Sequence, residues 1–134
     1  MLNVKAETQM LDTVQDFIHE TLEKAGIDAD IKALTQLDVA VEEVFVNIAN
    51  YAYAPNTGDA IIEAKVSDGS VLTVSFIDSG KAFDPLAAED PDITLSADER
   101  GIGGLGIFLT KKFMDKVEYQ RKDDKNILTL TKKF

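Results

Sequence analysis

The chain lacks cysteine altogether, and its 134 residues include a single histidine, His19. Without cysteine there is no disulfide, no thiolate nucleophile and no zinc–thiolate site. One histidine cannot form a histidine cluster for a metal, and it argues against a Ser-His-Asp site. His19 falls on the polar side of an expected helix, so we expect an ordinary solvated surface side chain there.

Positive charge and long apolar runs are also scarce. The chain has 14 Lys and Arg against 24 Asp and Glu, which gives a formal net charge of −10. Such a chain repels nucleic acid, so a phosphate ligand must be attracted by backbone amides or by a cation. No apolar run approaches the roughly 20 residues that cross a bilayer, and the N-terminus lacks the apolar core of a signal peptide. We therefore expect a cytoplasmic protein that binds neither a membrane nor nucleic acid directly.

Hydrophobic periodicity divides the chain into helical and strand-like segments. The expected elements are a strand at 2–7, a helix from a Thr8 N-cap to Gly26, a helix at 30–53, strands at 60–66 and 71–78 joined by an Asp68-Gly69 turn, a helix at 105–114, and a closing hairpin of strands at 116–121 and 126–133 about a turn at 123–125. Hairpins imply a mainly antiparallel sheet, and three amphipathic helices can cover one of its faces. We expect one domain over residues 1–134, an α/β two-layer sandwich of the α+β type.

Glu43, Asn47 and Tyr51 are spaced four residues apart on the second expected helix, so they share one face. The carboxylate of Glu43 and the amide oxygen of Asn47 lie one turn apart, and such hard ligands suit a Mg²⁺ ion that is also held by substrate phosphates. The alternative is a solvated polar face, which is how we interpret Asp38 and Glu42 on the same helix.

A second segment runs from a strand into Asp78-Ser79-Gly80. A carboxylate at a strand end can accept a hydrogen bond from an exocyclic amine, and a glycine two residues later lets a ring approach the backbone. The same three residues also form an everyday turn, which is the alternative.

A third segment, Gly101-Ile102-Gly103-Gly104-Leu105-Gly106, opens a helix. Four glycines in six residues before a helix N-terminus predict a cradle of free backbone amides for an anion. The segment is no Walker A motif, because no Gly-Lys-Ser/Thr follows, and no Rossmann fingerprint, because no strand precedes it. A flexible hinge before the helix is the alternative.

Taken in chain order, these segments resemble the N box, G1 box and G2 box of the GHKL ATPases, which share the Bergerat ATP-binding fold. The likeness covers nearly the whole chain and is greatest for the anti-sigma factor serine/threonine kinases. Their N box resembles residues 42–53, and their G2 box resembles residues 104–109 followed by Met114-Asp115. The resemblance implies that residues 1–134 form a single histidine-kinase-like ATPase domain.

The resemblance also implies roles for residues at the phosphate end of a bound ATP. Glu43 would be the general base, and Asn47 would bind Mg²⁺. The phosphates would accept hydrogen bonds from the backbone amides of Gly104, Leu105 and Gly106, and residues 85–103 would form the ATP lid. Tyr51 stands where many relatives carry histidine.

At the base end, the resemblance implies that Asp78 hydrogen-bonds the adenine amine and that Gly80 lines the base pocket. Threonines on the last strand often lie near adenine in this fold, which makes Thr129 and Thr131 further candidates.

The function implied is binding of ATP or ADP with Mg²⁺ and transfer of the γ-phosphoryl group to a serine or threonine. The partners implied are a STAS-type antagonist protein, which is phosphorylated, and a sigma factor, which is sequestered by a homodimer. One alternative is a nucleotide-dependent module that binds a regulator without catalysis. Another is the catalytic domain of a histidine kinase, but those domains usually carry asparagine at the position of Glu43.

Overall fold

The computed structural model of the chain describes residues 1–87 and 104–134, and these form two layers. One layer is a five-stranded sheet in the order β1-β2-β3-β5-β4, and every neighbouring pair is antiparallel. The strands are β1 (Leu2–Lys5), β2 (Asp59–Ser67), β3 (Val71–Asp78), β4 (Lys116–Lys122) and β5 (Lys125–Lys133). The expected antiparallel sheet is therefore confirmed.

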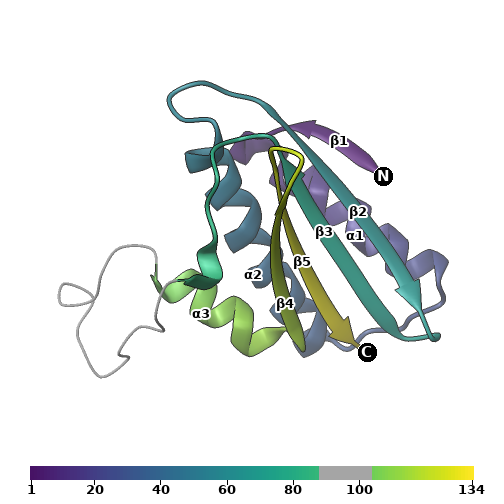
Figure 1. Ribbon diagram of the computed structural model, residues 1–134. Coiled ribbons are helices and arrows are strands. Elements are labelled where there is room, and N and C mark those ends of the chain that lie inside the picture. The colour runs from purple at the N-terminus through teal and green to yellow at the C-terminus, as the bar shows by residue number, and fades with distance from the viewer. Residues whose placement is uncertain (88–103) are drawn as a thin grey trace.

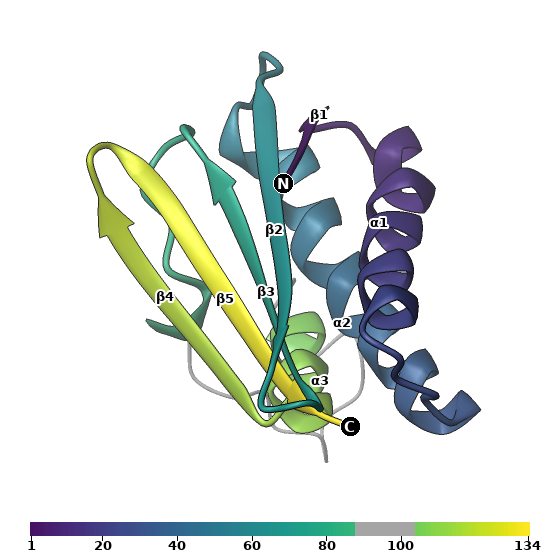
Figure 2. The ribbon, with the colours of Figure 1, turned by 90° about the vertical axis from the view of Figure 1, so that its right-hand side faces the viewer.

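The second layer consists of helices that all lie on one face of the sheet (Figure 2). They are α1 (Leu11–Lys24), α2 (Ile31–Asn47) with its π-helical extension η2 (Ile48–Ala52), and α3 (Gly104–Phe113); short 3-10 turns occur at η1 (Thr8–Met10) and η3 (Pro85–Ala87). Figure 1 looks onto the other, uncovered face of the sheet. Within the described ranges, no helix is long and apolar enough to cross a membrane.

The core lies between the two layers and follows from the periodicity of each element. On β3, alternate side chains such as Val74 and Phe76 are buried, as expected for a strand with one covered face. On α2, Leu37, Val41 and Val44 form the stripe that packs against them. Full burial of a side chain of this size contributes about 1.5–3 kcal/mol, so the shared apolar layer holds the helices to the sheet.

Two tight turns set the register of the hairpins. Asp68 and Gly69 both have positive φ, 52° and 79°, and the Ser70 amide donates to the Ser67 carbonyl at 3.2 Å, so this predicted turn is confirmed, with Ser70 as a third loop residue before Val71. At the second hairpin Asp123 and Asp124 have φ of 54° and 61° and make a two-residue turn between Lys122 and Lys125. The turn is therefore one residue shorter than predicted, because Lys125 already belongs to β5.

The two ends of α1 differ in how well the sequence predicts them. The stop at Gly26 is confirmed: its φ is 75°, and the amide of Ile27 donates to the Leu22 carbonyl at 3.0 Å, which closes the helix end. The Thr8 N-cap is wrong, because Thr8 begins a 3-10 turn and α1 starts only after Met10, with no side-chain cap.

His19 is not the solvated side chain that the sequence predicts. Its Nε2 lies 2.6 Å from Oδ1 of Asp38, so the pair links α1 to α2, and the two side chains are only 31% and 33% exposed. Asp38 was expected to be solvated as well, and that expectation is also wrong. A helical pattern separates apolar from polar positions, but it does not tell which polar position faces a neighbouring helix.

Candidate functional site

A cavity opens between α2, α3 and the adjoining ends of β3 and β5. It encloses about 650 Å³ of atom-free space, part of which is open to solvent. Its lining comprises Glu43, Val44, Asn47, Ile48, Tyr51, Ala52, Asp78, Lys81, Phe83, Pro85, Ile107, Thr110, Tyr119, Asn126 and Leu128. The exposed surface of the lining is mostly apolar, and polar groups such as those of Glu43, Asn47 and Asp78 converge on it, which is the usual character of a small-molecule site.

The polar face of α2 is one wall of this cavity. Glu43, Asn47 and Tyr51 all line it, as their spacing of four residues predicts for one helical face. The alternative of a solvated face does not describe Glu43 and Asn47, which are half-buried, whereas Tyr51 is 52% exposed. That alternative holds for the neighbouring Glu42, which is exposed.

Gly106, in the first turns of α3, lies directly against Glu43. A Cβ built on Gly106 would overlap Oε2 of the Glu43 carboxylate, so a side chain there would force the carboxylate to move. Thr110, one turn later, is buried and donates its hydroxyl to the Gly106 carbonyl at 2.9 Å. The start of α3 and the acidic face of α2 are thus brought together by the fold.

Gly104 and Leu105 belong to the first turn of α3, which begins at Gly104, one residue before the predicted start. The rest of that segment, Gly101 to Gly103, lies outside the described residues. So does most of the expected lid at 85–103, of which only Pro85–Ala87 is described, as the short turn η3.

Asp78 ends β3 at the opposite wall of the cavity and is only 5% exposed. Its Oδ1 accepts hydrogen bonds from the Gly80 amide at 2.9 Å and from Asn126 Nδ2 at 3.0 Å. A buried carboxylate is expensive unless it is hydrogen-bonded, and these two bonds meet that requirement.

Asn126 is a cavity residue that sequence reasoning missed. It stands directly opposite Asp78 in the β3–β5 register and is only 6% exposed. The signal was present in β5, where Asn126, Leu128 and Leu130 alternate with exposed or half-buried positions. That alternation places Asn126 on the covered face, but only the register of the sheet identifies Asp78 as its neighbour.

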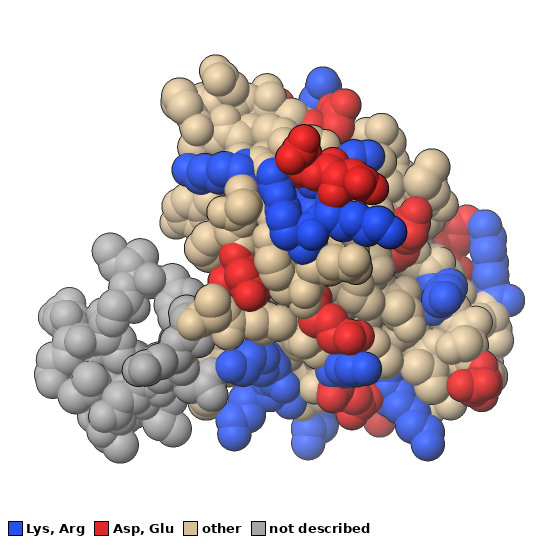
Figure 3. All heavy atoms as spheres, in the orientation of Figure 1, with Lys and Arg blue, Asp and Glu red and all other residues tan. Residues whose placement is uncertain are grey.

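The threonines proposed near adenine lie on the wrong side of the sheet. Thr129 and Thr131 occupy the alternate positions of β5, and Thr129 Oγ1 lies 3.1 Å from Ser75 Oγ on the uncovered face. That face carries interspersed acidic and basic side chains, as solvated surfaces do (Figure 3). Neither residue lines the cavity; the threonine that does is Thr110, from α3.

Gly80 makes a close backbone contact that the sequence did not predict. It is buried but does not line the cavity, and a Cβ on it would overlap the carbonyl oxygen of Ala52. The next amide, that of Lys81, donates to this same carbonyl at 3.0 Å. Glycine is therefore required for the loop after β3 to close against η2.

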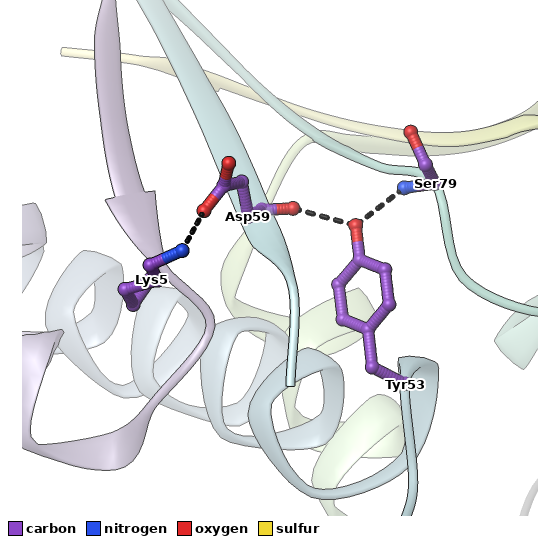
Figure 4. A network of polar contacts seen from close by, with 4 residues as sticks. All are labelled: Lys5, Tyr53, Asp59 and Ser79. Atoms are coloured by element: carbon purple, nitrogen blue, oxygen red, sulfur yellow. Dashed lines mark hydrogen bonds and ion pairs between the residues drawn. The ribbon is translucent and has the colours of Figure 1, made fainter. Parts of the chain in front are cut away.

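Tyr53, the residue after Ala52, holds the start of the same loop (Figure 4). Its hydroxyl donates to the Asp59 carbonyl at 2.6 Å and accepts from the Ser79 amide at 2.7 Å. The Asp59 side chain in turn pairs with Lys5 at 3.1 Å, which ties β1 to the start of β2. Tyr53 thus ties the end of η2 both to the start of β2 and to Ser79, the residue that follows Asp78.

Comparison with known proteins agrees with this geometry. The model of the histidine kinase-like ATPase domain family matches residues 4–132. The chain belongs to that family. The chain is 34% identical over 95 residues to the serine/threonine-protein kinase BtrW of Bordetella bronchiseptica. These aligned residues cover 71% of this chain and 67% of that protein. The chain is 28% identical over 111 residues to an anti-sigma F factor of a Thermoanaerobacter species, covering 82% and 76%.

Solved structures share the fold of this ATPase domain at low sequence identity. The RsbU and RsbW domains of Rv1364c from Mycobacterium tuberculosis superpose with a TM-score of 0.63 at 16% identity. That match covers 99% of this chain but only 32% of the solved chain. The catalytic domain of histidine kinase ThkA superposes with a TM-score of 0.56 at 16% identity, covering 99% and 97%.

The donor set of the ATPase domain fits Mg²⁺ held jointly with a nucleotide. Among the described residues, no group of three or more His, Cys, Asp or Glu side chains is placed to hold a metal alone. Asn47 and Glu43 nevertheless present oxygen atoms in the same cavity. Mg²⁺ commonly takes one or two protein ligands and completes its shell with phosphates and water, so these residues suit it.

Proposed function

We propose that this domain binds ATP with Mg²⁺ in the cavity and transfers the γ-phosphoryl group to a serine or threonine of a partner protein. One observation carries the proposal: Glu43 and Asn47 from α2 and Asp78 from β3 line a single cavity. Similarity to a relative named as a serine/threonine-protein kinase supports the reaction type.

In this proposal the adenine ring occupies the end of the cavity near β3 and β5. Its exocyclic amine donates to the Asp78 carboxylate, and its faces contact apolar lining such as Ile48 and Leu128. Adenine then satisfies a buried acceptor and covers apolar surface at once, and both effects favour binding.

At the other end of the cavity, α2 and α3 supply the groups that would contact the phosphates. Asn47 is the residue that would hold Mg²⁺, which would neutralise phosphate charge when bound. The hydroxyl oxygen of the partner forms a bond to the γ-phosphorus as the bond to the β–γ bridging oxygen breaks, and ADP leaves. Glu43 takes the hydroxyl proton. The amides of Gly104, Leu105 and Gly106 would contribute hydrogen bonds at the start of α3.

We assign the partners by the same resemblance: a STAS-type antagonist as the phosphorylated protein, and a sigma factor sequestered by a homodimer of this domain. The relatives named anti-sigma F factors support a role in sigma-factor control. The net charge of −10 favours binding a protein rather than nucleic acid.

The decisive experiment incubates the chain with γ-labelled ATP, Mg²⁺ and a candidate STAS protein. We expect label on the STAS protein in a bond that survives acid, as phosphoserine and phosphothreonine do. Acid-labile label would instead indicate histidine phosphorylation. Tight ATP binding without any transfer or hydrolysis would replace the kinase with a nucleotide-dependent binding module.

A further inference from the structure

The side chain of Asn126 uses every hydrogen-bonding position that it has. Its Nδ2 donates to Asp78 Oδ1 at 3.0 Å and to the Lys81 carbonyl at 2.8 Å. Its Oδ1 accepts from the Tyr119 hydroxyl and from the Phe83 amide, the latter at 3.3 Å. An asparagine amide offers two donors and two acceptor positions, so all four are filled in this buried environment.

This pattern leaves only one orientation for the amide group. Exchanging its nitrogen and oxygen would place an oxygen against the Asp78 carboxylate and the Lys81 carbonyl, where two acceptors would repel. It would also place an NH₂ group against the Phe83 amide. Asn126 is thus a rigid donor aimed at Asp78.

The arrangement also distinguishes the two oxygens of Asp78. Oδ1 accepts from both Asn126 and the Gly80 amide, so its two acceptor positions are occupied. A ligand amine is therefore left to approach Oδ2. Because χ2 of an aspartate is broad and two-fold, the carboxylate needs such a constraint to hold one oxygen toward the cavity.

We propose that Asn126 is a positioning residue that gives the site its preference for adenine, by holding the Asp78 carboxylate in one orientation. The inference rests on the proposed function, since it concerns the same cavity. Through Lys81 and Phe83, which line the cavity as well, Asn126 also ties the loop after β3 to the base end of the site.

The test measures dissociation constants of ATP, GTP and purine riboside triphosphate, which lacks the 6-amine, for the full chain and for Asn126→Ala. The parent should bind ATP at least about fivefold more tightly than either of the others, because they leave Asp78 without its donor. In Asn126→Ala that ratio should fall at least about threefold, because the Gly80 amide is then left as the one hydrogen-bond donor that holds the Asp78 carboxylate among the described contacts. If Asn126 had a purely structural role, the substitution would weaken the binding of all three nucleotides equally, and the preference for ATP would stay the same.

Two further variants make the result decisive. Ser75→Ala removes a side-chain hydrogen bond between the same two strands, β3 and β5, but on the uncovered face, so the ratio should not change. Tyr119→Phe keeps the ring and removes one of the four bonds of Asn126, so the ratio should fall less than in Asn126→Ala. Thermal unfolding of each variant shows whether it is folded; if Asn126→Ala is not, Tyr119→Phe decides.

An unchanged ratio in a folded Asn126→Ala, or in Tyr119→Phe when the alanine variant does not fold, would overturn the inference while leaving ATP binding intact. Failure of the parent to bind any of the three nucleotides would overturn the proposed function, and this inference with it. Equal binding of all three by the parent would remove Asp78 as the adenine contact, which also overturns the role of Asn126.

Discussion

The two ends of the cavity are built by different means. At the base end, Asp78 and Asn126 are paired neighbours on β3 and β5, and both are buried. Their hydrogen bonds run to each other, to nearby backbone and to the Tyr119 hydroxyl. At the phosphate end, Glu43 and Asn47 are half-buried on α2, and their surroundings depend on how α3 packs against that helix. The base end is therefore preorganised by strand register, whereas the phosphate end is assembled by helix packing.

This difference fits the two tasks that we assign. Recognition of a flat, neutral ring benefits from acceptors that are fixed before binding, because no ordering is needed when the ligand arrives. Phosphoryl transfer needs groups that act on a charged ligand, a metal and an incoming hydroxyl. The Glu43 carboxylate must therefore remain accessible to that hydroxyl. Substitutions that change one end of the cavity and leave the other intact separate the two.

Glu43→Gln should give the largest effect and confine it to the phosphate end. Glutamine keeps the shape of the side chain but cannot take a proton, so transfer should fall by at least about 100-fold while ATP affinity stays within a few-fold. Single-turnover transfer and calorimetry measure the two quantities. Glu42→Gln, at the exposed neighbouring position, is the matched control and should match the parent. Full activity of Glu43→Gln would remove the residue from catalysis.

Gly106→Ala tests whether the packing of α3 on α2 positions Glu43. The added Cβ would overlap the Glu43 carboxylate, and displacement of a reacting group by about 1 Å can cost up to about 100-fold in rate. Stability should hold or rise slightly, because alanine favours a helix by about 1 kcal/mol over glycine. Transfer assays beside thermal unfolding check this. A slow but stable variant is the expected result, and an active one would contradict the role of this contact.

Asn47→Ala should weaken ATP binding in Mg²⁺ at least about tenfold, by analogy with the loss that even indirect metal partners cause. In EDTA, the parent and the variant should bind ATP alike, because Asn47 then has no metal to hold. Calorimetry under both conditions makes the comparison. An Mg²⁺-dependent affinity equal to that of the parent would show that Asn47 is not the metal ligand.

Asp78→Asn probes the base end alone. The parent should prefer ATP to GTP at least about fivefold, because guanine places a carbonyl against the Asp78 acceptor. With asparagine, the side-chain amide can donate to that carbonyl, so the preference should shrink or reverse. Competition binding of the two nucleotides gives the ratio, with Ser75→Ala as the control on the same strand. Equal binding of ATP and GTP by the parent would contradict the assignment.

Thr129→Val should have the smallest effect of all. The residue lies on the uncovered face, where its hydroxyl meets Ser75 outside the cavity, so loss of that bond should cost about 1 kcal/mol or less. ATP affinity should not change. Thermal unfolding and calorimetry test both parts. A clear loss of ATP affinity would contradict the placement of Thr129 outside the binding site.

Features that depend on a few consecutive residues could be predicted from the sequence. The helix stop at Gly26 and the Asp68-Gly69 turn follow from positive φ, which glycine adopts readily. Glu43 and Asn47 share one helical face because their spacing alone requires it. Such features need no knowledge of the rest of the chain.

Other features were decided only by the tertiary structure. Asn126 became the partner of Asp78 through strand register, Gly80 met Ala52 through closure of a loop, and His19 met Asp38 through the packing of two helices. Each of these contacts joins segments far apart in the chain, and the sequence specifies the hydrogen-bonding capacity of each side chain but not its neighbour. Register and helix packing minimise the exposed apolar area of the whole domain, so the partners of its polar groups emerge only when that core has formed.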